Sequence, residues 1–161
     1  MNSRPVPNTT RHEACSELAA LITIRPAQVA KILAGEKNLE FRRRWACRPV
    51  TRLVIYSSWP RQEIIALADI AQTHRGSPAD LWALAQTKKG GIEQHMLYAY
   101  LDGCATGYAL ELTNVRAIPR GIQPRALFGA SFRPPQSFRY LKARALQRIE
   151  DVLRAQQEEE D

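Results

Sequence analysis

A lysine, a glutamate and an arginine follow one another closely in the segment that begins at Gly35. If residues 38–42 form a strand, alternation of side chains puts Glu40 and Arg42 on one face and the apolar residues between them on the other. Lys37 then lies in the turn that leads into the strand. Such a set of charges can bind a polar or anionic ligand. An ordinary solvated strand face has the same pattern, so both interpretations stay open at this point.

Each of these side chains has two possible roles. Lys37 can bind a substrate as a cation or, if removed from water, act as a general base. The alternative is a solvated lysine that pairs with Glu36 or Glu40. Glu40 can accept a hydrogen bond from the exocyclic amine of a nucleobase, or it can simply hold Lys37 or Arg42 in place.

Arginines are concentrated in the same region. Six of them occur within twenty residues: Arg42, Arg43, Arg44, Arg48, Arg52 and Arg61. Part of this group is expected to contact phosphate. Because strand faces alternate, not all six can line one groove, and the other interpretation is a solvated face.

Aromatic and hydroxyl side chains lie at the end of the next expected strand. Trp59, which precedes a proline in a turn, is the better candidate to stack on a base, whereas Tyr56 is as well explained by core packing. Ser57 and Ser58 are candidates for hydrogen bonds to a ligand. No base adjoins them in the sequence, so a nucleophilic serine is not indicated.

The helices and strands that must position these residues can be predicted from helix-capping and turn residues and from the periodicity of apolar residues. A strand is expected at 18–24, a helix at 27–34 that starts after Pro26 and stops at Gly35, and strands at 51–58 and 63–73. Two helices follow at 78–87 and 92–101, the first capped by Ser77, and then a strand at 106–115. Residues 118–133 are expected to be irregular except for a helical turn at 124–128, and 138–157 to form a long helix.

The order of these elements indicates an α+β protein. No helix separates the two central strands, and no glycine-rich phosphate loop follows a strand, so a small mixed sheet or barrel flanked by helices fits better than a doubly wound sheet. We expect a flexible leader over residues 1–17, one domain with a C-terminal helix over 18–157, and an acidic tail over 158–161.

Charge and composition restrict the partners. The 161-residue chain has a formal net charge of +7 and a pI near 9.7. Without the four acidic residues at its end, 23 basic residues face 12 acidic ones, a net charge of +11. So basic a domain is suited to nucleic acid. The three cysteines and three histidines are scattered, so no metal site or cofactor is predicted. No membrane span or signal peptide is evident, and a cytoplasmic location is expected.

The segment from Gly35 to Arg42 resembles the G-x-K-x-x-E-x-R motif of the ASCH domain family, a branch of the PUA-like superfamily. All four motif positions match: Gly35, Lys37, Glu40 and Arg42. The flanking segments also resemble it, with Ile24-Arg25-Pro26 upstream and Tyr56-Ser57-Ser58-Trp59-Pro60 downstream. Three further segments are similar to a subgroup of predicted transcriptional regulators in this family: the Trp82 helix, Tyr98 to Gly103 and Pro134 to Phe138.

The resemblance implies a small PUA-like mixed β-barrel flanked by helices, with a cleft beside the motif for RNA or a nucleotide-like ligand. The expected function is therefore binding of RNA or of single-stranded or modified nucleic acid, with a regulatory role. The alternative is a hydrolase of a modified nucleoside or RNA that uses Lys37 and Glu40. In the family's amidohydrolase branch a threonine follows the lysine by three positions, where this chain has Glu40. A regulator that acts through protein contacts alone is a third class.

Overall fold

The computed structural model describes residues 17–161, so all but the last residue of the expected leader lies outside the described part. Six strands form one mixed sheet in the order β2-β5-β4-β3-β1-β6. The first three strands along the chain are β1 (Ala19–Ile24), β2 (Leu39–Arg42) and β3 (Arg52–Ser57). They are followed by β4 (Glu63–Gly76), β5 (Gly107–Ile122) and β6 (Phe138–Leu141). β1 pairs in parallel with β3, and the other pairs are antiparallel.

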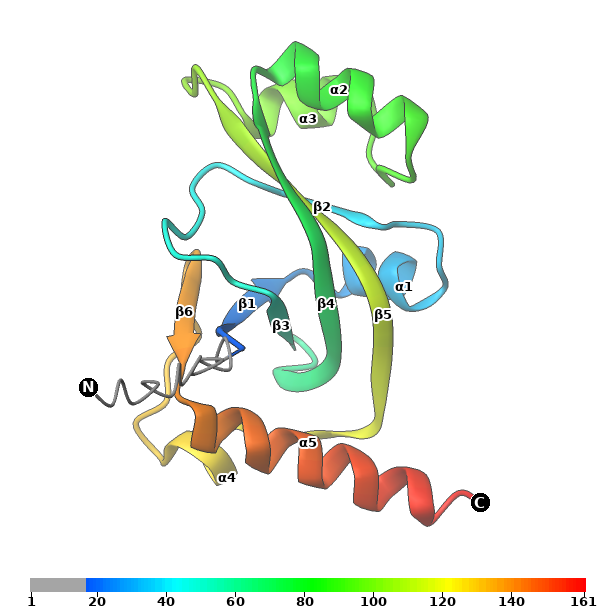
Figure 1. Ribbon diagram of the computed structural model, residues 1–161, viewed down its shortest axis with the longest axis vertical. Coiled ribbons are helices and arrows are strands. Elements are labelled where there is room, and N and C mark those ends of the chain that lie inside the picture. The colour runs from blue at the N-terminus through cyan, green and yellow to red at the C-terminus, as the bar shows by residue number, and fades with distance from the viewer. Residues whose placement is uncertain (1–16) are drawn as a thin grey trace, which may run out of the picture.

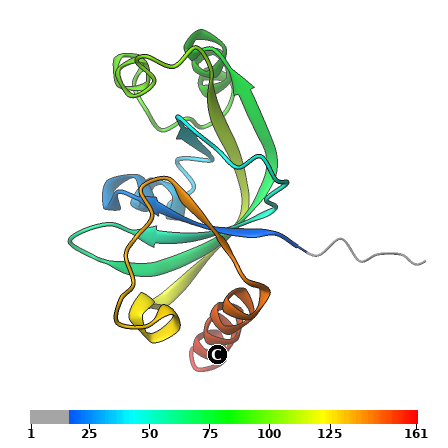
Figure 2. The same ribbon diagram turned by 90° about the vertical axis from the view of Figure 1, so that its left-hand side faces the viewer.

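Within residues 17–161, five helices flank the sheet, which confirms the predicted α+β class. They are α1 (Pro26–Leu33), α2 (Pro78–Thr87), α3 (Gln94–Tyr100), α4 (Pro124–Phe128) and α5 (Ala143–Glu158). The long strands β4 and β5 twist together from the α2–α3 pair at one end of the molecule to α5 at the other (Figures 1 and 2). No helix within residues 17–161 is long and apolar enough to cross a membrane.

Three apolar clusters explain why the sheet keeps this shape. α1 packs through Val29 and Ile32 on one cluster, and α5 packs through Leu146, Ile149 and Leu153 on a second. The third cluster joins α2 and α3 to Leu39 and Phe41 of β2. Leu39 and Phe41 therefore point into the core, as the alternation predicts.

The expected long helix over 138–157 is wrong at its start. Phe138 to Leu141 form β6, which pairs with β1 in the register Phe138↔Ile22, and α5 begins only at Ala143. Phe138 also packs against Trp45, with 5.0 Å between the ring centroids. A strand partner supplied by β1 thus overrides a local pattern that is compatible with a helix.

The expected irregular segment after residue 117 is also wrong in part. β5 continues to Ile122 through Pro119 and Gly121, and its pairing with β4 shifts register between Ile64 and Ala66. Such an irregularity lets a proline, which has no N–H to donate, remain in the strand. The acidic tail also has a described contact, an ion pair between Arg120 and Glu159.

Candidate functional site

The turn before β2 is fixed by backbone hydrogen bonds at both ends. Gly35 ends α1 with a φ of +73°, a conformation that favours glycine, and the Lys37 N–H donates to Lys31 O. On the far side, the Asn38 N–H donates to Lys89 O at 2.8 Å and the Lys89 N–H donates to Asn38 Oδ1 at 3.0 Å. Lys37 therefore enters the protein from a rigid turn held between α1 and the end of α2.

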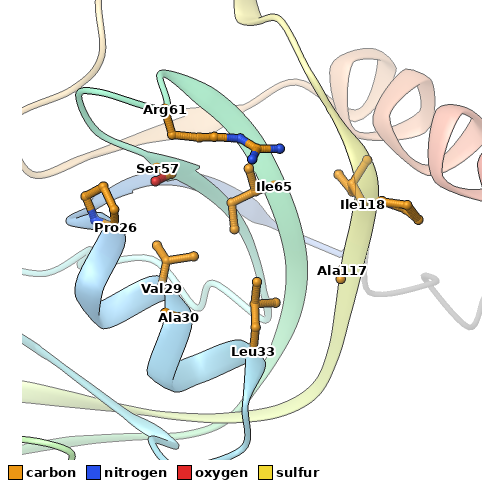
Figure 3. A pocket seen from close by; sticks show the side chains of 10 residues that line it. Pro26, Val29, Ala30, Leu33, Ser57, Arg61, Ile65, Ala117 and Ile118 are labelled. Carbon is orange, nitrogen blue, oxygen red and sulfur yellow. The ribbon is translucent and has the colours of Figure 1, made fainter.

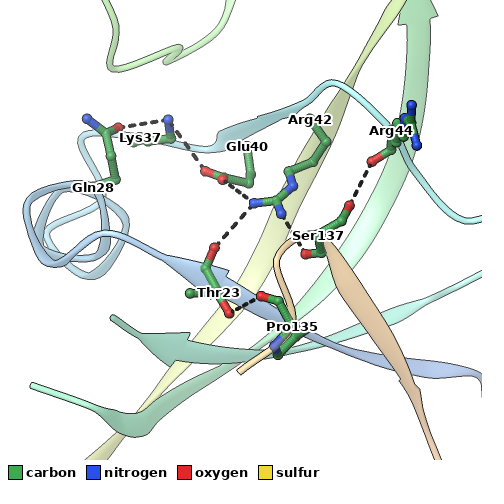
Figure 4. A network of polar contacts seen from close by, with 8 residues as sticks. All are labelled: Thr23, Gln28, Lys37, Glu40, Arg42, Arg44, Pro135 and Ser137. Carbon is green, nitrogen blue, oxygen red and sulfur yellow. Dashed lines mark hydrogen bonds and ion pairs between the residues drawn. The ribbon is translucent and has the colours of Figure 1, made fainter. Parts of the chain in front are cut away.

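Lys37, Glu40 and Arg42 converge into one line of charges (Figure 4). Lys37 Nζ lies 3.6 Å from Glu40 Oε2, and Arg42 Nη1 lies 3.5 Å from Glu40 Oε1. Lys37 Nζ also donates to Gln28 Oε1 at 2.9 Å. All three charged residues are buried, so the solvated-face interpretation does not describe this strand.

Arg42 carries the line of charges across to the other edge of the sheet. Its guanidinium donates to Thr23 O at 3.2 Å and to Ser137 O at 2.5 Å. The Thr23 hydroxyl in turn donates to Pro135 O at 2.8 Å. The segment before β6 therefore covers the charged face of β2 (Figure 4).

Burial changes the acid–base properties of the site. Desolvation lowers the pKa of Lys37, and the carboxylate of Glu40 opposes this effect without cancelling it. Burial also raises the pKa of Tyr100. The charge of Glu40 acts in the same direction on this pKa, and the charge of Arg42 acts in the opposite direction. Lys37 is thus an ammonium that releases its proton more readily than an exposed lysine.

Gln28, which accepts the hydrogen bond of Lys37 Nζ, also lines a cavity of about 360 Å³. Its lining includes Lys31 and Gly91, and Lys31 Nζ donates to Gly91 O at 3.0 Å. A Cβ at Gly91 would lie 2.9 Å from Lys37 Cβ, so only glycine leaves room for the lysine. The Gln28 amide is the one lining group that also contacts Lys37 Nζ in the described structure.

The other predicted site residues lie in different environments. Arg43 and Arg44 are exposed, and Arg43 Nη1 donates to the carbonyl oxygens of Tyr100 and Asp102. Tyr56 is buried in the core against Phe132, with 5.8 Å between ring centroids.

The rest of the Tyr-Ser-Ser-Trp-Pro segment runs from core to surface. Ser57 is buried, Ser58 is half-buried, and Trp59 is 76% exposed before the cis bond to Pro60. The structure therefore does not bring Tyr56 to a ligand surface, whereas Trp59 is open to one. Among residues 17–161, no group of three histidine, cysteine or acidic side chains is arranged to hold a metal.

Gln28, Thr23, Gly91, Tyr100 and Ser137 are site residues that sequence reasoning missed. They come from five separate elements or loops, and nothing in their spacing connects them with Lys37. The Gly90-Gly91 pair was a usable signal, because consecutive glycines often mark a close approach of backbone to another group.

No family model matches the chain, but one curated protein and several solved structures resemble it. A protein of Zymomonas mobilis named ASCH domain-containing ribonuclease is 26% identical over 132 residues, covering 81% of this chain and 88% of the relative. The crystal structure of ASCH from Zymomonas mobilis superposes with a TM-score of 0.74 at 26% identity, over 83% of this chain and 94% of that one.

The chain is similar to this ASCH protein in both sequence and fold. A serine-to-alanine variant of the Zymomonas protein superposes on this chain with a TM-score of 0.74 and 26% identity, over 83% of this chain and 95% of the variant. The similarity extends along most of both chains. It gives no support to the subgroup of transcriptional regulators, to which the expected regulatory role was tied.

Proposed function

We propose that this ASCH-like domain cleaves RNA, with Lys37 and Glu40 as its catalytic residues. The observation that carries the proposal is the desolvated Lys37 ammonium, which lies 3.6 Å from Glu40 and donates a hydrogen bond to Gln28, a residue that lines a cavity. The Zymomonas relative that carries the name ribonuclease supports the same class of substrate. The expectation of a binding module is thereby replaced by the hydrolase alternative as the leading function.

RNA suits this set of groups because it brings its own nucleophile. In the proposed reaction the 2′-hydroxyl oxygen attacks the neighbouring phosphorus, the O2′–P bond forms and the P–O5′ bond breaks. Glu40 accepts the proton of the 2′-hydroxyl, and Lys37 donates a proton to the leaving O5′. The products are a 2′,3′-cyclic phosphate and a 5′-hydroxyl.

The arrangement around the two residues serves this exchange. The substrate phosphate takes the place of the Gln28 amide at Lys37 Nζ, so it enters from the cavity that Gln28 lines. The lowered pKa of Lys37 makes its ammonium a better proton donor than an exposed lysine. After product release, a proton returns from Glu40 to Lys37 across their short separation. Arg42 keeps Glu40 in place through their 3.5 Å ion pair.

The exposed cations have a separate role in this proposal. Arg43 and Arg44 lie on the surface next to the buried line of charges, where they can contact RNA phosphates without being desolvated. Trp59, exposed on the β3–β4 turn, offers a face on which a base can stack.

A binding function without cleavage is the second candidate. The observation that favours it is the mutual pairing of Lys37, Glu40 and Arg42, which are all buried. Lys37 and Arg42 also donate hydrogen bonds to other protein groups. In that case the line of charges only shapes the fold, and the exposed arginines and Trp59 bind RNA.

Single-turnover cleavage of a fluorescent RNA separates the two functions. Lys37→Met is expected to reduce the cleavage rate by about a hundredfold or more, the scale of lost general acid catalysis, while Arg144→Gln on the exposed side of α5 leaves it unchanged. Replacing the scissile nucleotide by its 2′-deoxy form is expected to stop cleavage there. RNA that is bound and recovered intact would establish the binding function instead, and cleavage by folded Lys37→Met at the wild-type rate would refute the assignment of the residue.

A further inference from the structure

A second cavity, of about 350 Å³, lies on the opposite side of α1, between this helix and the β4–β5 pair (Figure 3). Its volume is in the range of about 300–1,000 Å³ that is usual for small-molecule sites. Eight of the ten lining residues are apolar: Pro26, Val29, Ala30, Leu33, Ile65, Ala117, Ile118 and Pro119. We call this cavity the α1 groove.

One buried hydroxyl faces the apolar walls of the α1 groove. Ser57, at the end of β3, is only 2% exposed and lines the groove. Of the ten residues that line the groove, only Ser57 and Arg61 have polar side chains. The Ser57 hydroxyl therefore offers a ligand in the groove a hydrogen bond from an otherwise apolar wall.

A guanidinium lies at the rim of the groove. Arg61 reaches across from the β3–β4 turn, and its Nε donates to Glu63 Oε2 at 2.6 Å (Figure 3). Glu63 Oε1 accepts a hydrogen bond from the Gln123 amide at 3.0 Å. Both oxygens of the Glu63 carboxylate are therefore hydrogen-bonded to protein groups, one of which is Arg61.

The room for this carboxylate comes from Gly121. A Cβ at Gly121 would lie 2.6 Å from Glu63 Oε2. The terminal nitrogens of Arg61 have no partner among residues 17–161, so they remain available for two hydrogen bonds to a phosphate.

We propose that the α1 groove binds one nucleotide of the RNA substrate, which deepens the proposed function and rests on it. The base lies between the apolar walls and meets the Ser57 hydroxyl with a polar edge, and the adjoining phosphate is held by Arg61. The combination of an apolar cavity, one hydroxyl in its wall and a cation at its rim is complementary to a base with its phosphate.

The groove is placed so that one RNA strand can reach both sites. Ser57 pairs with Ile24 at the end of β1, and the preceding residue, Thr23, receives the hydrogen bond of Arg42. Each site therefore has a contact with the end of β1, just before the chain enters α1. Trp59, two residues after Ser57, is exposed to stack the next base.

Calorimetry with the four 5′-mononucleotides tests the groove directly, with ribose 5-phosphate and inorganic phosphate as ligands that lack a base. Binding of at least one mononucleotide is expected to be about tenfold or more tighter than that of ribose 5-phosphate, because only the nucleotide fills the apolar walls. Equal affinity for the mononucleotides and for ribose 5-phosphate would reduce the site to an anion contact and overturn the proposal.

Two variants with matched controls locate the binding. Ala30→Leu adds bulk to an exposed position that lines the groove, and Ala27→Leu makes the same change on the same helix outside it. Arg61→Gln removes the rim charge, and Arg144→Gln removes one from α5. Loss of about tenfold in affinity is expected for the first member of each pair and none for the second. Equal effects within both pairs would place the nucleotide elsewhere and refute the groove.

The same variants keep this proposal separate from RNA cleavage. Lys37→Met, which is expected to lose cleavage, should still bind the mononucleotide. Ala30→Leu should raise the KM for RNA with little change in kcat. A protein that binds mononucleotides in the groove but cleaves no RNA would refute only the catalytic function. Active cleavage with no mononucleotide binding and an unchanged KM in Ala30→Leu would refute only the groove.

Discussion

The guanidinium of Arg42 donates to the carbonyl oxygen of Ser137 at 2.5 Å, although 95 positions separate the two residues in the sequence. Arg42 lies on edge strand β2, and Ser137 immediately precedes the other edge strand, β6. One side chain thus connects the two edges of a curled sheet. The same guanidinium is the end of the charged line that begins at Lys37.

Loss of this connection is expected to destabilise the fold. Arg42→Ala leaves two carbonyl oxygens and the Glu40 carboxylate without their donor, and breaking a buried ion pair costs about 3–5 kcal/mol. Urea denaturation should show this loss in the free energy of unfolding. Arg44→Ala, which removes an exposed arginine two residues away, should change it by less than about 0.5 kcal/mol. Similar midpoints for the two variants would contradict the structural role of Arg42.

Lys37 and Glu40 are expected to be energetically coupled. Each single change, Lys37→Met or Glu40→Gln, removes one charge from the buried line and should destabilise the protein. The double variant should lose less than the sum of the single losses, with a coupling of about 0.5–3 kcal/mol, because residues in one network are not additive. Unfolding free energies of the four proteins measure the cycle. Strictly additive losses would show that the 3.6 Å pair contributes nothing.

The pH dependence of RNA cleavage should reflect the lowered pKa of Lys37. The ammonium is the proton donor, so it is fully present below its pKa in the folded protein and is lost as the pH rises through that value. The alkaline fall in the cleavage rate should therefore begin well below the pH at which an exposed lysine titrates. Pre-steady-state rates with RNA in excess give the profile. A rate that stays level up to the range of ordinary lysines would exclude Lys37 as the acid.

The carboxylate of Glu111, on β5, is expected to make contacts that are lost in acid. Glu111 Oε2 lies 3.0 Å from His74 Nε2 and Oε1 lies 2.8 Å from Lys88 Nζ, and these hydrogen bonds lower the pKa of Glu111. Because the pKa is lower in the folded state, the stabilisation is present above the unfolded pKa and is lost as the pH falls through the folded one.

Glu111→Gln should therefore be less stable than the wild type at pH 7, and the two should converge in acid below the folded pKa of Glu111. Thermal melting at a series of pH values makes the comparison. Gln147→Glu on α5 is a control for a change of one charge at an exposed position. A difference that persists unchanged into strong acid would show that the glutamine harms the fold by another route.

RNA affinity should depend on salt through the exposed arginines. Arg43→Ala and Arg44→Ala are each expected to reduce the slope of log K against log salt by about 0.7–0.9, the effect of one phosphate contact. Arg154→Ala on α5 should leave the slope unchanged. Titrations of a short single-stranded RNA at several salt concentrations give the slopes. Unaltered slopes in both variants would place the RNA away from the surface formed by Arg43 and Arg44.

Local signals in the sequence determined much of the fold. Pro26 and Gly35 mark the two ends of α1, and Ser77 begins α2 with a capping box completed by Asp80. The alternation over residues 38–42 placed Leu39 and Phe41 in the core. These features are predictable because helix caps, turn glycines and strand alternation depend on neighbours within a few residues.

The sequence alone also grouped Lys37, Glu40 and Arg42, but only the tertiary structure decided that they are buried and joined. A strand face remains solvated unless another segment covers it, and the cover over Arg42 comes from Pro135 and Ser137, almost one hundred residues later. β6 was not predicted for a similar reason: its strand conformation depends on pairing with β1, which lies far from it in the sequence. Which segment covers a charged face is a long-range packing outcome, and no local pattern specifies it.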